Sequence, residues 1–202
     1  MTEFKSAVIL AGGRSTRMGF DKQMLKVQGK PIVDHLITLL CTRFEDIMVS
    51  SPTPTPLYAL DQVRVIQDIH DNIGPLGGIH SALVHAKSEA VFTIACDMPF
   101  LDIPYIDYMM AQMEGGAYDA CLTSHGGHLE TFHAFYCRSA LPVLEAELAQ
   151  GRYSVNRFAC KIDTLIIPEE IAKQYLPDWR AFTNLNTPQD YEEFCREQGA
   201  LM

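Results

Sequence analysis

The stretch S-A-V-I-L, Ser6–Leu10, decides the fold, because it is apolar after its first residue and leads directly into Ala11-Gly12-Gly13. A short apolar run that stops at glycines is typical of a buried strand followed by a turn. A second run, A-V-F-T-I-A over Ala90–Ala95, leads in the same way into Cys96-Asp97. Neither run alternates with polar residues, so both predict strands whose two faces are covered.

Outside these two runs, apolar spacing predicts five further strands and five helices. The expected strands are residues 47–51, 63–67, 120–123, 131–136 and 163–167. The expected helices are one with Pro31 as its first residue, residues 79–86, one marked by Ile106, Met109, Met110 and Met113, and residues 140–150 and 188–198. Residues 72–78 are expected to form a loop. Strands that alternate with helices predict an α/β fold, a three-layer Rossmann-like arrangement with a mostly parallel sheet and helices on both faces.

Composition narrows the class of protein. The 202 residues suit a single domain, 1–202, and 48% hydrophobic with 20% charged residues exclude disorder as the main state. The formal net charge of −9 argues against a nucleic-acid partner. We expect no membrane association and a cytoplasmic location, because no signal-like or membrane-spanning run is present and no cysteines form a C-x-x-C pair.

The ends of the predicted strands carry the candidate site. In a parallel sheet of this kind, ligands bind beyond the carboxyl ends of the strands. These ends hold Gly12-Gly13, Ser50-Ser51, Asp68 and Asp97. We therefore expect those positions to converge.

The first of these ends opens the motif L-A-G-G-R-S-T-R-M-G-F-D-K, Leu10 to Lys22. Adjacent glycines let the backbone approach a ligand, and successive N–H groups in such a turn cradle phosphate oxygens. Arg14, Arg17 and Lys22 add positive charge to an acidic chain. The motif is neither a Walker A loop nor a G-x-G-x-x-G fingerprint. The alternative is a solvated surface loop.

Three carboxylates offer ligands for a base, a ribose or a metal ion. Asp97 ends an apolar strand, and Mg²⁺ bound to phosphates uses one or two such groups. The alternative for Asp97 is a helix cap, although Asp102 is better placed to cap the helix that follows. Asp68 and Asp71 follow another strand, and either is also explained as a turn residue. In G-P-L-G-G, Gly74 to Gly78, paired glycines permit close approach to a ligand at a helix start.

Two later motifs are less specific. His125-Gly126-Gly127-His128 spaces two histidines for zinc, but without an evident third ligand a solvated loop is favoured. We expect His133 to pack within its strand, with a substrate contact as the alternative. In N-L-N-T-P, Thr187 and Pro188 suit a helix start. Capping leaves Asn184 and Asn186 unexplained.

Taken together, these motifs resemble the molybdenum cofactor guanylyltransferase (MobA) family of nucleotidyltransferases with a glycosyltransferase-A-like fold. The resemblance implies transfer of GMP from GTP to the terminal phosphate of molybdopterin, with Mg²⁺ as cofactor. The implied GTP-binding residues are Leu10, Ala11, Gly12, Gly13, Lys22, Ser50, Asp68, Gly78 and Asp97. Lys22, Arg17 and Asp97 would be catalytic, Asp97 as the metal ligand, and Asn184 and Asn186 would face the pterin.

The chain departs from that pattern at two places. Ser50-Ser51 stand where the family often has Asn, and Thr131 stands where relatives typically have Pro. Proteins that deliver or accept the cofactor are implied partners. Alternative functions are a cytidylyltransferase or sugar-nucleotide pyrophosphorylase, or a non-catalytic nucleotide-binding module. Relatives that use CTP usually read L-A-A-G, so Gly12 after Ala11 favours GTP.

Overall fold

The computed structural model describes residues 3–11, 25–27, 29–51, 63–70 and 73–200. Its strands are β1 (Ser6–Leu10), β2 (Lys26–Val27), β3 (Lys30–Pro31), β4 (Asp46–Ser50), β5 (Val63–Ile66), β6 (Ala90–Ala95), β7 (Ala120–His125), β8 (His128–Cys137) and β9 (Thr164–Ile167). Its α-helices are α1 (Ile32–Leu40), α2 (Pro75–His85), α3 (Ile103–Met113), α4 (Leu141–Ala149), α5 (Val155–Ala159), α6 (Glu169–Ala172) and α7 (Pro188–Ala200). Short 3-10 helices η2 (Arg138–Ala140) and η3 (Arg180–Phe182) join them.

The main sheet has seven strands in the order β5-β4-β1-β6-β8-β7-β9. All neighbouring strands are parallel except at β8, which runs antiparallel to both β6 and β7. The small strands β2 and β3 form a separate antiparallel pair. The predicted mostly parallel sheet is confirmed.

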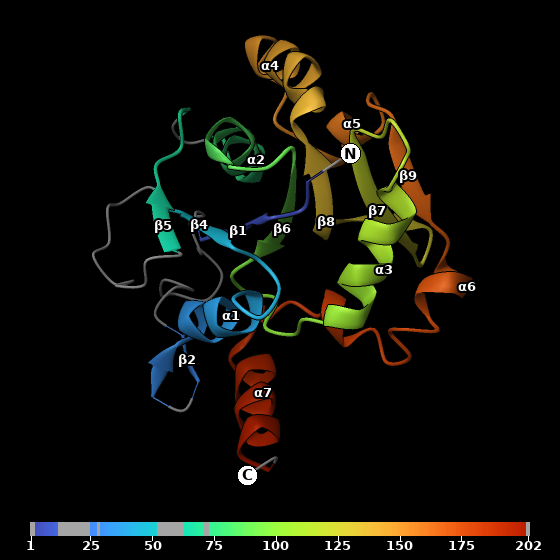
Figure 1. Cartoon of the computed structure of the whole chain (residues 1–202). Coiled ribbons are helices and arrows are strands. Elements are labelled where there is room, and N and C mark those ends of the chain that lie inside the picture. The colour runs from blue at the N-terminus through green and yellow to red at the C-terminus, as the bar shows by residue number, and fades with distance from the viewer. Residues whose placement is uncertain (1–2, 12–24, 28, 52–62, 71–72, 201–202) are drawn as a thin grey trace.

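Helices cover both faces of this sheet (Figure 1). On one face lie α2, α4 and α5, and on the other lie α1 and α3. The two layers of packing explain why β1 is buried along its whole length. The three-layer α/β architecture expected from the sequence is therefore confirmed. In the described part of the chain, every helix is too short or too polar to cross a lipid bilayer.

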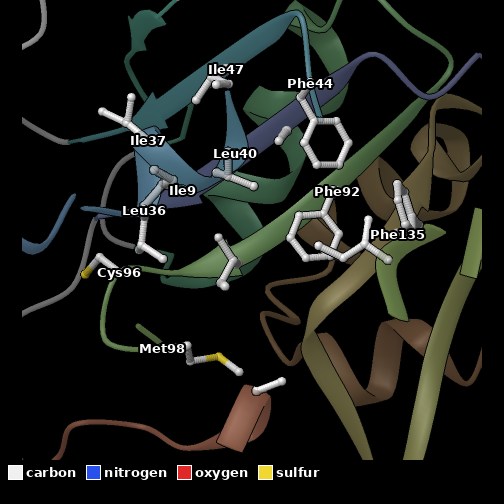
Figure 2. Close-up of a cluster of buried hydrophobic side chains, with 14 of the residues drawn as sticks. Ile9, Leu36, Ile37, Leu40, Phe44, Ile47, Phe92, Cys96, Met98 and Phe135 are labelled. Carbon is white, nitrogen blue, oxygen red and sulfur yellow. The ribbon is translucent and has the colours of Figure 1, made fainter. Parts of the chain in front are cut away.

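Aromatic side chains fill the layer between the sheet and α1. Phe92 of β6 stacks on Phe44 with ring centroids 5.6 Å apart, and it meets Phe135 of β8 edge to face at 5.3 Å. Leu36 and Leu40 of α1 close the same cluster, which Figure 2 shows beside Ile9 of β1. This packing fixes α1 and β8 against the strands whose ends form the site.

Several observed helix and strand boundaries differ from the predicted ones. Pro31 belongs to β3 and stands just before α1, so it is not the first helical residue. Helix α2 begins at Pro75, within the stretch expected to be a loop, because Pro fits the first turn of a helix and Gly77 and Gly78 pack tightly there. The predicted strands at 120–123 and 131–136 extend into a hairpin that closes at residues 126–127. Helices α5 and α6 lie in stretches where none was predicted.

Candidate active site

The carboxyl ends of β1, β4 and β6 lie side by side at one edge of the sheet. Leu10 is paired with both Ser50 of β4 and Ala95 of β6. Just beyond the strands, the Ala11 N–H donates to the Ser50 carbonyl at 2.9 Å, and the Cys96 N–H donates to the Leu10 carbonyl at 3.1 Å. These backbone bonds hold the strand ends in register, so residues that follow them emerge together.

Ser50 and Asp68 form the polar floor of this edge. The Ser50 hydroxyl donates to the Asp68 carboxylate with Oγ and Oδ1 2.5 Å apart. Ser50 is buried, whereas Asp68 is half-buried and so reaches the surface of the site. Serine, the departure from the family pattern at this strand end, therefore orients the carboxylate that the sequence singled out. A carboxylate held in this way accepts hydrogen bonds from ribose hydroxyls or base N–H groups.

Helix α2 approaches the same strand ends at Gly78. A Cβ atom added there would lie 2.7 Å from Leu10 Cδ2 and 3.0 Å from Ser50 Oγ. Only a residue without a side chain fits at this contact without a shift of its neighbours. Gly78 thus brings the first turns of α2 against Leu10 and Ser50, which joins three of the predicted residues at one place.

Asp97 follows β6 and connects the strand edge to the segment before α7. Its carbonyl oxygen accepts a hydrogen bond from the Leu185 N–H at 2.8 Å. Asn184 is consequently next to this contact, half-buried, with its amide donating to the Phe182 carbonyl at 3.3 Å. Asn186 is exposed and its backbone N–H donates to the Asp190 carboxylate at 3.0 Å. Asn184 and Asn186 therefore both lie within two residues of the bond to Asp97.

The helix caps show which aspartate near this edge has a purely structural role. Asp102 caps α3, because its Oδ1 accepts from the Tyr105 N–H at 2.8 Å. Thr187 caps α7, since its hydroxyl oxygen accepts from the Asp190 N–H at 3.1 Å. Both assignments agree with the sequence prediction. Capping of α3 is thus provided by Asp102 and not by Asp97.

A divalent cation is compatible with Asp97. The half-buried carboxylate follows an apolar strand, and that strand is paired with β1 up to Leu10. Mg²⁺ prefers such oxygen ligands and is commonly held by one or two carboxylates together with substrate phosphates and water. Among the described residues, no group of three His, Cys, Asp or Glu side chains gathers as a metal site.

Both histidine motifs lie in strands β7 and β8, so the solvated loop expected around His125 and His128 is limited to a two-residue turn. His125 and His128 are opposite each other in the β7–β8 hairpin, and Gly126-Gly127 form its turn. His133 is fully buried in β8 between the rings of Phe92 and Tyr105, as expected for a packed strand residue. Burial lowers the pKa of His133 to about 4, so its ring is neutral at physiological pH.

Some predicted residues lie outside the described part of the chain. They are Gly12, Gly13, Arg14, Arg17, Lys22 and Asp71. Of the described candidates, Leu10, Ala11, Ser50, Asp68 and Gly78 come together directly. Asp97, Asn184 and Asn186 form a second group, joined to the first through the pairing of β1 with β6.

Comparisons with known proteins identify relatives of this chain. A model of the MobA-like NTP transferase domain matches residues 7–162. The molybdenum cofactor guanylyltransferase of Syntrophotalea carbinolica is 43% identical over 98% of this chain and 94% of its own length. A probable molybdenum cofactor guanylyltransferase of Peptoclostridium acidaminophilum is 38% identical over 96% of this chain and 89% of its own length.

Solved structures share the fold. The molybdopterin-guanine dinucleotide biosynthesis protein A of Archaeoglobus fulgidus superposes with a TM-score of 0.83 at 23% identity, covering 98% of this chain and 100% of that one. The 2-C-methyl-D-erythritol 4-phosphate cytidylyltransferase of Thermus thermophilus gives 0.67 at 10% identity, covering 96% and 98%. At these identities the likeness shows the fold alone. The family model and the two relatives show that the chain belongs to the MobA-like NTP transferase family, among the molybdenum cofactor guanylyltransferases.

Proposed function

We propose that this nucleotidyltransferase transfers GMP from GTP to the terminal phosphate of molybdopterin. One observation carries the proposal: a molybdenum cofactor guanylyltransferase is 43% identical over 98% of the chain. The convergence of Leu10, Ser50, Asp68 and Gly78 at one sheet edge supports it, because this is where α/β folds of this type bind nucleotides.

The reaction needs little acid–base chemistry from the protein. An oxygen of the acceptor phosphate attacks the α-phosphorus of GTP, and the bond from that phosphorus to the β-phosphate bridging oxygen breaks. Pyrophosphate leaves with the bonding electrons. The second pKa of a phosphate monoester is about 6, so the acceptor is largely ionised at neutral pH. Positioning and charge neutralisation therefore remain as the main tasks of the site.

We assign the guanosine half of GTP to the edge formed by β1, β4 and β5. Leu10, Ala11, Gly12 and Gly13 would line it with backbone groups, and Gly78 would let the nucleotide approach α2. Asp68, held by Ser50, would accept hydrogen bonds from the guanosine. The hydrogen bond of 2.5 Å between Ser50 and Asp68 supports this role, since it limits the directions in which the carboxylate can face.

We assign the phosphates to Lys22, Arg17 and a magnesium ion that the Asp97 carboxylate would hold. Lys22 and Arg17 would neutralise the triphosphate, and Asp97 would hold Mg²⁺. The ion, when bound, supplies positive charge that offsets the charge developing on the α-phosphate and the pyrophosphate. Asn184 and Asn186 would contact the pterin substrate, which fits the bond that joins their segment to Asp97. We further propose a cytoplasmic location and contacts with proteins that deliver or accept the cofactor.

The most direct test of the metal assignment is Asp97→Asn. Asparagine keeps the shape of the side chain but removes the charge that a hard cation prefers. We expect guanylyl transfer to be lost at saturating Mg²⁺, while the melting temperature changes little. The matched control is Asp107→Asn, an exposed position on α3, which should leave the rate unchanged. A folded Asp97→Asn protein within a few-fold of the normal rate would remove Asp97 as the metal ligand.

A further inference from the structure

The chain has one tryptophan, Trp179, and it stacks on His125 at the tip of strand β7. The two rings have centroids 4.1 Å apart and an interplanar angle of 23°. Phe182 packs against both, at 5.8 Å from His125 and 5.9 Å from Trp179. Trp179 and His125 are both half-buried, and the His125 side chain is 30% exposed. We call this pair the aromatic platform.

The platform lies at the same edge of the sheet as Asp97. Strand β7 is antiparallel to β8, which is antiparallel to β6, so β6 and β7 end at the same side. Two strand spacings separate them, about 10 Å. The segment that carries Trp179 continues to Leu185, whose N–H binds the Asp97 carbonyl at 2.8 Å. A ligand whose phosphate is held near Asp97 therefore has the platform about two strand spacings away along the same edge.

The backbone around the platform is strained. In the described part of the chain, two residues other than glycine have positive φ, Trp179 at 58° and His133 at 59°. Both contact Phe182, whose carbonyl accepts from Asn184. Bulky residues adopt this conformation only where the surroundings enforce it, and such positions gather at ligand sites. The positive φ of Trp179 shows that its surroundings, Phe182 among them, hold the segment in one arrangement.

A carboxylate borders the platform. Glu130 Oε1 is 3.6 Å from His125 Nδ1, and the two side chains are 27% and 30% exposed. Burial raises the pKa of the Glu130 carboxyl, and the nearby His125 opposes that shift. Two adjacent N–H donors on a planar ligand would satisfy both carboxylate oxygens, as they do in bidentate pairs.

The hairpin holds this arrangement in place. Its Gly126-Gly127 turn has φ values of 55° and 78°, which side chains disfavour, and the Gly126 N–H donates to Glu169 at 3.0 Å. His125 and Glu130 are therefore fixed on opposite sides of a short, anchored turn. A site that is already ordered loses little entropy when a ligand binds.

We infer that the aromatic platform and Glu130 recognise the pterin ring of the acceptor substrate. A pterin is a flat heterocycle with an amino group beside a ring N–H, so its face suits the platform and its edge suits the carboxylate. This inference rests on the proposed function, which requires a pterin phosphate as acceptor. It assigns recognition of the pterin ring to residues separate from those proposed to bind GTP.

The test measures steady-state KM for molybdopterin and for GTP in Trp179→Ala, Trp179→Phe and Glu130→Gln. Loss of a stacking surface should raise the molybdopterin KM about 5- to 150-fold in Trp179→Ala. Trp179→Phe should recover much of that loss, and Glu130→Gln should raise the same KM. The GTP KM should stay unchanged in all three. The matched control is Tyr153→Ala, which removes a 46% exposed ring from another surface.

A binding measurement distinguishes failure of the platform inference from failure of the proposed function. Because Trp179 is the only tryptophan, its emission reports on the platform directly, and 6-hydroxymethylpterin phosphate should quench it in the unmodified enzyme. An unchanged molybdopterin KM in Trp179→Ala, or an equal rise of both KM values with a lower melting temperature, would overturn the platform. An enzyme that binds the pterin phosphate through Trp179 but transfers no GMP would overturn the proposed function instead.

Discussion

Gly78 occupies a contact in which even one carbon atom changes the packing of two strand ends. An added Cβ would lie 2.7 Å from Leu10 Cδ2 and 3.0 Å from Ser50 Oγ. Gly78→Ala should therefore lower the free energy of unfolding by about 1–3 kcal/mol, as overpacking does. It should also weaken GTP binding, because Ser50 must move relative to Asp68. Urea unfolding and calorimetry measure both effects.

The control for this change is on the same helix. Val84→Ala, at a 41% exposed position of α2, should change stability by no more than about 0.5 kcal/mol. If Gly78→Ala behaves like Val84→Ala in both measurements, then Leu10 yields freely and the close approach of α2 has no role in the site.

His133 couples stability to pH. Burial lowers its pKa from 6.5 to about 4. Between these values the unfolded chain takes up a proton that the folded protein does not, so stability falls as pH decreases from 6.5 to 4. The contribution of this group is about 1.4 kcal/mol per pH unit at most. His133→Asn, which tolerates positive φ, should lose less stability than the unmodified protein between pH 6.5 and 5.

Urea unfolding at several pH values measures that difference. The comparison between the two proteins isolates His133, because other buried histidines such as His80 titrate equally in both. Parallel pH profiles would mean that the folded protein protonates His133 at its ordinary pKa.

At the scale of elements, the stability of α3 depends on its N-cap residue, Asp102. The Asp102 carboxylate accepts from the Tyr105 N–H at 2.8 Å. Asp102→Ala should therefore cost about 1 kcal/mol of stability, the usual loss for a helix N-cap, and leave guanylyl transfer intact. Thermal unfolding and the transfer rate test this together. Gln112→Ala, exposed on the same helix, is the control and should change neither. A lost rate with unchanged stability would exchange the roles assigned to Asp102 and Asp97.

The elements that could be predicted from the sequence are those with a strong local pattern. β1 and β6 are apolar runs without polar alternation, so their bounds and burial follow from the residues alone. The sequence does not predict the start of α2, because paired glycines weaken a helical pattern and only contacts with Ile73, Leu10 and Ser50 explain them. The antiparallel course of β8 depends on pairing with β6 and β7, which apolar spacing does not encode.

The candidate site likewise has a part that the sequence predicts and a part that it does not. Asp68, Asp97 and Gly78 belong to motifs at strand ends or at a helix start, so the sequence indicates them directly. Trp179 of the platform and the neighbouring Phe182 belong to no motif, and their relation to Asp97 arises only when the chain returns to the sheet edge at Leu185. The single tryptophan was the one signal that could have drawn attention to that segment.

At the scale of the whole molecule, an acidic chain must bind two anionic substrates. The formal net charge is −9, so attraction of a triphosphate depends on local cations and on backbone N–H groups. In the proposed arrangement the nucleotide would occupy the half of the sheet edge formed by β5-β4-β1-β6, and β8-β7-β9 lie beyond it. The two substrates would therefore meet near Asp97, where the two halves join.

The measurement that tests the central claim most directly is transfer of labelled nucleotide to molybdopterin, with GTP, CTP and ATP compared at equal concentration in Mg²⁺. We predict that labelled GMP is joined to molybdopterin with one pyrophosphate released per transfer, and that CTP and ATP are far poorer donors. Equal transfer from CTP, or binding of GTP without any transfer, would contradict the assignment of this chain as a guanylyltransferase.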